Sequence, residues 1–291
     1  MTLFVMALVT GVALGSIYGL IALGFQITYS VSGTVNFAQG SVVMLGAVSG
    51  YMIYQFAGDM HWIAYPLAIL LCGGFGALVE RVLVRPFARR HNEGWLMATV
   101  AGGILLDNTA LFTFGNEPRM FPSPLVNDTI QIAGVGLYPL QLLIPVATLA
   151  IAVTLHVIFN RTQQGTALLA VVQNAKAASL MGINTQRMIT ASFVLSAMLA
   201  GLAGLLIAPL ASVHSDMGVL FGLKAFAVAI LGGMTSASGI MIAGLIYGIA
   251  EALVTSYFGS SLTSIVVFSA VILVLVIKPN GLFGRSALHK V

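Results

Sequence analysis

The sequence predicts an all-helical protein that spans a membrane about eight times, and three observations lead to this fold class. Hydrophobic residues make up 59% of the chain and charged residues only 7%, whereas a soluble domain carries roughly 25% charged residues. Apolar runs of about 20 residues, the length that crosses a bilayer as a helix, recur along the whole chain. These runs lack the ten-residue alternation of membrane β-barrels, so helices are the predicted spanning elements.

We expect the spanning segments to lie, in order, at 5–29, 40–57, 62–80, 95–115, 139–159, 188–208, 223–256 and 260–277. The N-terminus has no basic n-region, so the first run is expected to be a retained membrane segment rather than a cleaved signal peptide.

Two polar stretches interrupt this pattern. The first, SGTVNFAQGS at 32–41, lies in a region, 1–58, that contains no Asp, Glu, Lys or Arg. The second, GGMTSASG at 232–239, divides a run that is too long for one crossing. A turn explains such a stretch simply, but breaks also survive at membrane depth where protein or a water-filled cavity satisfies the freed backbone groups. Paired interruptions are the sequence feature typical of a transport pathway, so we predict two broken or re-entrant stretches.

The distribution of cations predicts the orientation of the chain. The loops 80–93 and 161–187 hold seven of the twelve Lys and Arg residues, and 278–290 holds three more. The loop 116–138 has one cation and 209–222 has none. The basic loops are therefore expected in the cytoplasm and the other two outside. The clustered arginines are not interleaved with aromatic residues, which argues against nucleic-acid binding.

Small residues recur every four positions in three of the runs, a spacing that lets helix backbones approach closely in lipid. These sets are Gly11, Gly15 and Gly19; Ser192, Ser196, Ala200 and Gly204; and Gly244, Gly248 and Ala252. They predict helix contacts within a compact bundle. The tripeptide Ile-Tyr-Gly occurs at both 17–19 and 246–248, but it is too short to establish an internal repeat.

The loop 116–138 is predicted to contain a small hairpin on the outer face. Ile130, Ile132, Val135 and Leu137 roughly alternate around Ala133-Gly134. The hairpin either caps the bundle or receives a partner.

The loop 161–187 is predicted to contain a cytoplasmic helix from Ala167 to Met181, which has no Gly or Pro, with Gly182 as its C-terminal stop. The residues expected to share one side are Leu168, Leu169, Val172, Ala175, Ala178 and Ser179. A partly apolar helix with so few cations is better suited to dock on a cytoplasmic partner than to lie on lipid.

The sequence contains no phosphate-binding loop, zinc-protease motif or nucleophile elbow, so no catalytic residue is predicted. Its single Cys72 and five scattered His residues predict no metal site. Among charged residues near the membrane, Glu80 and Arg81 are expected to pair at an interface. Asp107 and Glu251 are either proton or cation sites, members of buried pairs, or carboxylates close to the membrane interface.

Several ordered segments resemble the permease subunits of branched-chain amino acid ABC importers, the LivH type. NAKAASLMGINT resembles the coupling-loop signature of that family, and ERVLVRPF resembles its first cytoplasmic loop. GVALGSIYGLIALGFQITY and VNFAQGSVVMLGA resemble its first segments, and GLKAFAVAILGGMTSASGIMIAGLIYGIAEAL and KPNGLFGR its last. The resemblance covers nearly the whole chain.

The resemblance implies a single permease domain, 1–291, in a bacterial inner membrane. Such a subunit pairs with a second permease and two cytoplasmic ATPases that bind ATP and magnesium, and a periplasmic binding protein delivers its substrate. This chain itself is then expected to bind no cofactor and to be no enzyme. Branched-chain or other hydrophobic amino acids are the implied substrates, and the mechanism is ATP-driven alternating access.

Together with the two breaks, the resemblance indicates where function lies. The expected pathway residues are Asn36, Phe37, Gln39, Gly40, Asp107, Gly232, Gly233, Thr235 and Ser236. The expected coupling helix is 165–184, with ATPase contacts from Gly165, Ala167, Asn174, Ala178, Leu180, Gly182 and Ile183.

The sequence also departs from the family pattern. Thr166 and Leu169 stand where Arg is common, Asp107 where Gln is common, and Thr235 and Ser238 where Gly and Pro are usual. Urea, short amides or aromatic compounds are therefore alternative substrates. The alternative mechanism is an ion-coupled carrier or channel that uses Asp107 and Glu251.

Overall fold

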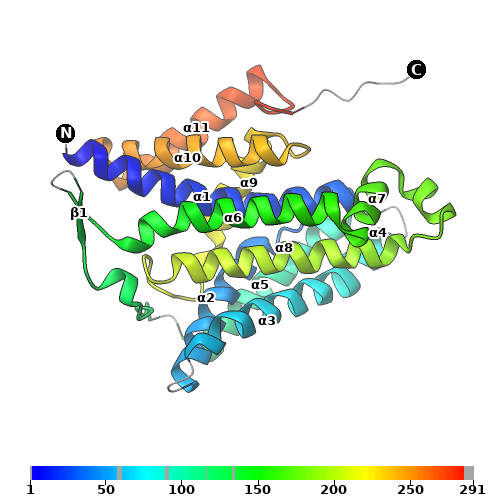
Figure 1. Ribbon diagram of the computed structural model, residues 1–291, viewed down its shortest axis with the longest axis horizontal. Helices are drawn as coiled ribbons and strands as arrows, with labels where there is room; N and C mark the ends of the chain where they lie inside the picture. The colour runs from blue at the N-terminus through cyan, green and yellow to red at the C-terminus, as the bar shows by residue number, and fades with distance from the viewer. Residues whose placement is uncertain (1, 58–60, 89–91, 116, 133–134, 285–291) are drawn as a thin grey trace. The chain divides into compact units, whose positions relative to one another are not determined.

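The computed structural model describes residues 2–57, 61–88, 92–115, 117–132 and 135–284, which are almost entirely helical (Figure 1). Its long helices are α1 (Thr2–Ser32), α2 (Gln39–Phe56), α3 (Ala64–Leu78), α5 (Trp95–Phe114), α6 (Pro139–Arg161), α7 (Gln163–Leu180), α8 (Thr185–Ile207), α9 (Met217–Gly232), α10 (Ala237–Phe258) and α11 (Ser260–Ile277). Its short elements are η1 (His61–Ile63), η2 (Val79–Val84), α4 (Arg85–Ala88), η3 (Pro124–Val126), β1 (Ile130–Ile132) and β2 (Val135–Leu137).

The eight predicted apolar runs are confirmed as helical. Within the described residues, seven helices are long and apolar enough to cross a membrane, namely α1, the continuous stretch from α3 to α4, α5, α6, α8, α10 and α11. The predicted break in the run 223–256 is confirmed, because α9 ends at Gly232 and α10 begins at Ala237. The first break is confirmed as well, since α1 ends at Ser32 and α2 begins at Gln39.

Contacts divide the chain into two compact units, and each unit combines segments that are distant in the sequence. Unit 1 consists of residues 1–26, 123–149 and 224–291, and unit 2 consists of residues 27–122 and 150–223. Each unit therefore contains parts of the N-terminal and the C-terminal halves of the chain.

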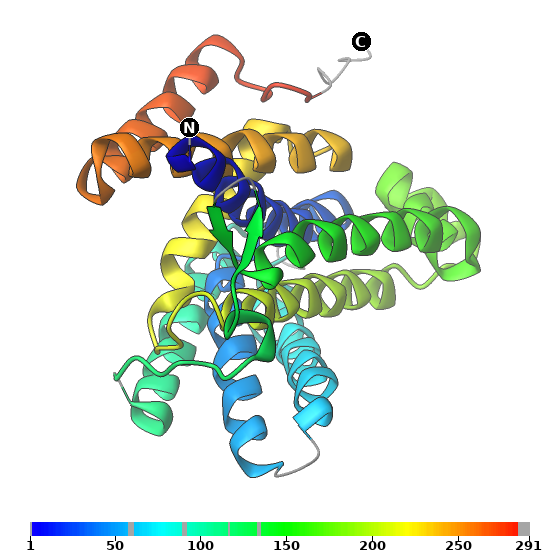
Figure 2. The same cartoon turned by 60° about the vertical axis from the view of Figure 1, so that its left-hand side comes forward.

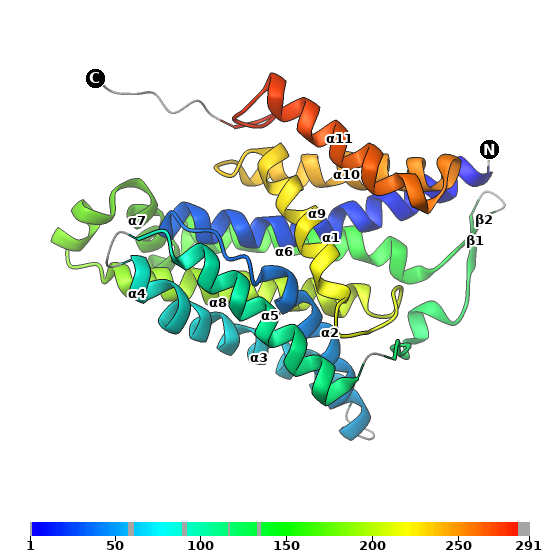
Figure 3. The same cartoon turned by 180° about the vertical axis from the view of Figure 1, so that it is seen from behind.

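In unit 2, α2 packs against α3, α5 and α8 (Figure 3). Glycine makes the approach of α2 to α8 possible, because a Cβ atom on Gly46 would lie 2.5 Å from the Cα atom of Gly201. A Cβ atom on Gly204 would similarly overlap the backbone of Val43. The small-residue stripe predicted at 192–204 is thus confirmed as a helix contact, and at Gly204 the two backbones meet directly.

In unit 1, the glycine stripes of α1 and α10 face each other. Gly11 lies against Ile249, Gly15 against Gly244, and Gly19 against Met241. Because one numbering rises as the other falls, the two helices are antiparallel. This contact also brings the two Ile-Tyr-Gly triplets together, with the rings of Tyr18 and Tyr247 edge to face at 5.6 Å between centroids.

The hairpin predicted near residue 130 is confirmed. Strands β1 and β2 are antiparallel, with Ile130 opposite Leu137, and they lead into α6 (Figure 2). The predicted turn residues 133 and 134 lie outside the described residues. At the start of α6, the Gln141 amide donates to the Thr10 hydroxyl at 3.5 Å. The N-terminal part of α1 therefore lies at the end of unit 1 that carries the hairpin.

The two cation-poor loops meet in unit 2, where the backbones of Arg119 and Val213 exchange two hydrogen bonds of 3.0 and 2.8 Å. The guanidinium group of Arg119 lies 4.4 Å from the centroid of the Phe114 ring. This stacking satisfies the one cation of the loop 116–138 locally.

Candidate functional site

The first break begins near the start of α8 and reaches its middle. At one end, Val31 packs with Leu168 and Val171 of α7, which precedes α8. At the other end, the side chain of Gln39 contacts Ser196, which lies near the middle of α8. Residues 33–38 thus extend along the first half of α8, and α2 begins beside its midpoint (Figure 3). The break is therefore a non-helical segment within the bundle, buried from Thr34 to Asn36 and exposed at Gly33.

Asn36 organises this segment and is fully buried. Its side-chain oxygen accepts a hydrogen bond from the Ala38 amide at 3.1 Å, and its carbonyl oxygen accepts one from the Gln39 amide at 3.1 Å. The side-chain nitrogen is buried and has no hydrogen-bond partner among the described residues. Asn36 therefore turns the chain into α2 and keeps one donor unused.

Gln39 is also fully buried, but both ends of its amide are occupied. The nitrogen donates to the Ser196 carbonyl oxygen at 3.1 Å, and the oxygen accepts from the Ser196 hydroxyl at 3.1 Å. This paired contact fixes the start of α2 against α8. The sequence indicated Ser196 only as a small residue in a packing stripe and did not reveal this polar role.

One face of α5 completes the surroundings of the α2 start. Thr99 accepts a hydrogen bond from the Phe37 amide at 3.4 Å. A Cβ atom on Gly103 would lie 3.0 Å from the Ser41 hydroxyl oxygen. Asp107 interacts with the same hydroxyl, while its Oδ1 atom is buried without a hydrogen-bond partner among the described residues. Spacing of four residues places all three positions of α5 on one side of the helix.

Gly40 brings the start of α9 against the start of α2, since a Cβ atom there would lie 2.7 Å from the Gly218 carbonyl oxygen and 3.1 Å from the Gly222 Cα atom. Unit 2 therefore gathers five of the predicted pathway residues around one helix start. They are Asn36, Phe37, Gln39, Gly40 and Asp107. We call this group the α2-start cluster.

The other four pathway candidates, Gly232, Gly233, Thr235 and Ser236, belong to unit 1 and form the turn between α9 and α10. Gly233 adopts a φ of +86°, which favours glycine. The Ser236 hydroxyl caps α10 by accepting from the Gly239 amide at 3.2 Å.

The C-terminal segment covers this turn. The amide of Leu282 donates to the carbonyl oxygen of Leu231 at 2.7 Å, and Gly284 lies against Gly233. Thr235 remains exposed. The segment KPNGLFGR resembled the family without revealing this role in closing the second break.

Glu251 forms a buried pair with Lys224 in unit 1. Their side-chain nitrogen and oxygen atoms lie 2.5 Å apart, and their side chains are 9% and 17% exposed, respectively. The Lys224 nitrogen also donates to the Tyr18 hydroxyl at 3.5 Å. Of the roles left open by the sequence, the structure thus shows buried pairing for Glu251.

The predicted cytoplasmic helix lies within α7, which consists of two helical pieces. Asn174 has extended φ and ψ angles of −161° and 97°, and its side-chain oxygen accepts from the Ala177 amide at 3.0 Å, so it caps the second piece. The helix ends at Gly182 as predicted, with a φ of +85°. The Ile183 amide donates to the Ala178 carbonyl oxygen at 3.1 Å, which completes a Schellman motif.

The prediction of which face of this helix is apolar was partly wrong. Leu168, Val171 and Ala178 are buried, whereas Val172, Ala175 and Ser179 are exposed. The two pieces follow different phases because Asn174 interrupts the helical period.

Some of the residues predicted to contact the ATPase are buried within unit 2, and others are exposed to solvent. Gly165 is buried where a Cβ atom would lie 2.5 Å from the Phe159 Cα atom, and Ile183 packs on the buried face of α7. Ala167 is half-buried, and Gly182 is exposed. At the tip, the side chains of Leu180 and Met181 are 83% and 82% exposed, respectively. The helix therefore presents an apolar tip to its surroundings.

The predicted pairing of Glu80 with Arg81 was wrong, because the partner is Arg85. Its guanidinium group donates to both Glu80 oxygens at 3.0 and 2.7 Å. Gln186 and Thr190 of α8 donate to the same carboxylate at 2.7 and 2.9 Å. The π-helical stretch η2 turns Glu80 toward α8, which the spacing of adjacent residues in the sequence could not reveal.

Comparison with known proteins accords with this architecture. The family described as branched-chain amino acid transport system, permease component, matches residues 7–277. The permease LivH of Escherichia coli (strain K12), from a high-affinity branched-chain amino acid transport system, is 34% identical over 99% of this chain and 98% of its own length. LivM of the same organism, described as a permease of a high-affinity branched-chain amino acid transport system, is 24% identical over 93% of this chain and 68% of its own length.

A solved structure of PsaBC from Streptococcus pneumoniae in complex with Fab has a similar fold. Its TM-score is 0.50 at 14% identity, covering 95% of this chain and 92% of that chain. The chain is a multi-pass membrane protein, and it belongs to the permease component family of the branched-chain amino acid transport system.

Proposed function

We propose that this permease imports branched-chain or similar hydrophobic amino acids across a bacterial inner membrane. The observation that carries the proposal is the end-to-end match to LivH, which covers 99% of this chain. The proposed assembly pairs the chain with a second permease of the LivM kind, two cytoplasmic ATPases that bind ATP and magnesium, and a periplasmic binding protein. The apolar tip of α7 and the buried α2-start cluster support this division of roles.

The α2-start cluster is the proposed place where substrate meets the chain. An amino acid carries a carboxylate and an ammonium group. The positive end of the α2 dipole and the unused donor of Asn36 suit the carboxylate, and the buried oxygen of Asp107 suits the ammonium group. Phe37 and Gly40 belong to the same cluster, whereas Gln39 acts by fixing α2 on Ser196. The turn at 232–236 stays a proposed pathway element.

Replacing Asn36 by Leu is expected to lower leucine uptake at least tenfold, because it removes the unused donor and the side-chain oxygen that accepts from the Ala38 amide in the turn before α2. Uptake is measured in proteoliposomes that contain the permeases, the ATPases and the binding protein. Asn36→Ser retains a side-chain oxygen to accept from the Ala38 amide and is expected to keep the assembly intact with reduced uptake. Asn108→Leu is the matched control, because Asn108 is exposed on α5 and bonds only to the preceding turn of its own helix. Normal uptake by Asn36→Leu would contradict the proposed site.

Replacing Leu180 by Glu is expected to reduce the amount of ATPase that co-purifies with the permease by about 10- to 100-fold. Burying a leucine contributes roughly 1.5–3 kcal/mol, and each 1.4 kcal/mol changes binding tenfold. The control is Met120→Glu, since Met120 is 86% exposed in the loop predicted outside. Equal recovery of ATPase with both variants would show that α7 is not the coupling contact.

The same uptake assay, run without ATP or with the ion gradient collapsed, separates the two transport mechanisms. An ion-coupled carrier requires uptake that persists without ATP and collapses with the ion gradient. The pairing of Glu251 with Lys224 disfavours that mechanism, because the proposed ion site already holds a cation of the protein. Urea, short amides and aromatic compounds are tested as competitors of leucine for the associated binding protein.

A further inference from the structure

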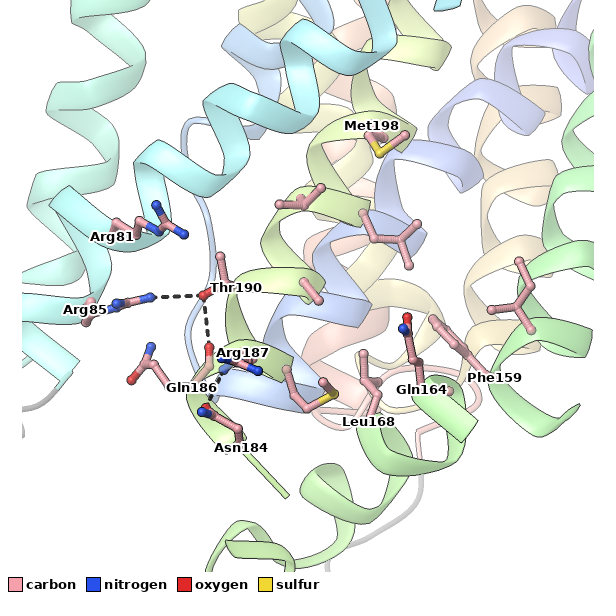
Figure 4. A pocket seen from close by; sticks show the side chains of 16 residues that line it. Arg81, Arg85, Phe159, Gln164, Leu168, Asn184, Gln186, Arg187, Thr190 and Met198 are labelled. Atoms are coloured by element: carbon pink, nitrogen blue, oxygen red, sulfur yellow. Dashed lines mark hydrogen bonds between the residues drawn. The ribbon is translucent and has the colours of Figure 1, made fainter. Parts of the chain in front are cut away.

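Unit 2 contains a cavity of about 850 Å³ that the proposed transport pathway does not use (Figure 4). One end is lined by the side chains of Arg81, Arg85 and Arg187. The other end is lined by apolar residues of α8, namely Val194, Leu195 and Met198, while Ile158 and Phe159 at the end of α6 line the side next to α7. The volume is within the range of sites that hold a small-molecule or cofactor ligand, which is roughly 300–1,000 Å³. The cavity is thus cationic at one end and apolar at the other.

The charges at the cationic end are not balanced by the protein. Glu80 neutralises Arg85 through a pair of hydrogen bonds. Among the described residues, neither Arg81 nor Arg187 has a carboxylate within ion-pair distance. The buried Glu80 network also holds Thr190, another lining residue, against Arg85 at 3.0 Å. Two guanidinium groups without a carboxylate partner among the described residues, next to the Glu80 network, therefore favour an anionic ligand.

The shape of the cavity indicates what kind of anion it accepts. The lining residues of α8 run along the helix, and the part from Arg187 to Met198 joins the cationic end to the apolar end. This stretch spans about 16 Å at 1.5 Å per residue. α8 is one of the membrane-spanning helices, so the apolar end lies within the bilayer region and the arginines lie at its edge. An acidic side chain of a docked protein would be too short to fill both ends, whereas a headgroup with an acyl chain fills them.

We infer that this cavity binds an anionic phospholipid, with its phosphate on Arg81 and Arg187 and an acyl chain along Val194, Leu195 and Met198 of α8. The first two turns of α7 contribute Gln164, Gly165 and Leu168 to the same cavity. A bound lipid therefore braces the helix through which the ATPases are proposed to act. This role in coupling rests on the proposed function, whereas lipid binding itself does not.

The test measures lipid binding to the full-length purified permease by native mass spectrometry, with phosphatidylglycerol and phosphatidylcholine of the same chains. Phosphatidylglycerol is expected to bind and phosphatidylcholine is expected not to compete. The double variant Arg81→Gln/Arg187→Gln is expected to bind phosphatidylglycerol about 30-fold more weakly, from roughly a factor of five for each arginine. The control Arg161→Gln/Lys176→Gln removes two exposed cations that do not line the cavity, and it is expected to bind normally.

A second variant tests the apolar half. Ala191 lines the cavity and is exposed, so Ala191→Trp is expected to fill the space and abolish lipid retention without disturbing the core. Ala150→Trp, at an exposed position of α6 outside the cavity, is the control for added bulk.

Three results would overturn the inference. The first is an equal loss of lipid in the double variant and its charge control, which would show general surface attraction. The second is displacement of the lipid by inorganic phosphate, with Ala191→Trp still binding phosphatidylglycerol, which would assign the cavity to a free anion. The third is normal lipid binding by Arg81→Gln/Arg187→Gln with loss of ATPase co-purification, which would make it a protein-docking site. Lipid binding is measured on the purified permease without transport. A failure of leucine uptake by the assembled importer would therefore contradict the proposed function and not the lipid site.

Discussion

Replacing Lys224 by Met is expected to destabilise the protein by about 3–5 kcal/mol, the usual cost of removing one partner from a buried ion pair. The Glu251 carboxylate is 9% exposed, and its second oxygen already has no hydrogen-bond partner among the described residues. Without the lysine it would remain as a charge in a spanning helix, where carboxylates cost about 2.5–3.5 kcal/mol. The measurement is the free energy of unfolding of the purified protein, titrated with sodium dodecyl sulfate in mixed micelles.

The double variant Lys224→Met/Glu251→Leu distinguishes the pair from its surroundings. It removes both charges and keeps similar volume, so most of the lost stability is expected to return. Lys176→Met is the matched control, because Lys176 is exposed on α7, and its effect is expected within about 0.5 kcal/mol. If the double variant is as unstable as the sum of its two single variants, Glu251 and Lys224 do not act as a pair.

Replacing Glu80 by Leu is expected to cost about 3 kcal/mol, because Arg85, Gln186 and Thr190 together lose the carboxylate that accepts their hydrogen bonds. The effect is expected to be smaller than for Lys224, since Arg85 is 25% exposed and regains contact with water. The loss is measured by the same unfolding titration. Hydrogen exchange is expected to rise at the start of α8, which the network ties to Glu80.

Glu80→Gln retains one acceptor oxygen, so its free energy of unfolding is expected to lie between those of the wild type and Glu80→Leu. Glu93→Leu is the control, because Glu93 is exposed and close to the same loop in the sequence. Unchanged hydrogen exchange at residues 186–190 in Glu80→Leu would show that the network does not hold this end of α8.

The helices were predictable because each spanning segment needs about 20 mostly apolar residues, which it buries or presents to lipid. A run of that length is visible in the local composition of the sequence. Both interruptions were predictable for the same reason, since polar and glycine-rich stretches are rare in such runs. The end of α7 at Gly182 followed from one glycine whose backbone angle favours that residue.

The parts that could not be predicted depend on contacts between distant residues. Nothing near Gln39 indicates that Ser196 occupies both ends of its amide, because 157 positions separate the two. The partner of Glu80 depended on a π-helical stretch that shifts the phase of the helix, so the adjacent arginine was chosen wrongly. The apolar face of α7 was misjudged because Asn174 can cap a helix as well as continue one. Periodicity alone does not distinguish these two uses.

The close contact between α2 and α8 bears on how the bundle can move. Gly46 and Gly201 meet through their backbones, so few side chains interlock across this part of the interface. Surfaces of this kind resist separation more than shear, because sliding preserves most of the van der Waals contact. The paired hydrogen bonds between Gln39 and Ser196 then define one discrete position along the sliding direction. A shift of α2 by one residue pair would break that register while leaving the helices in contact, which makes this interface a candidate for stepwise displacement.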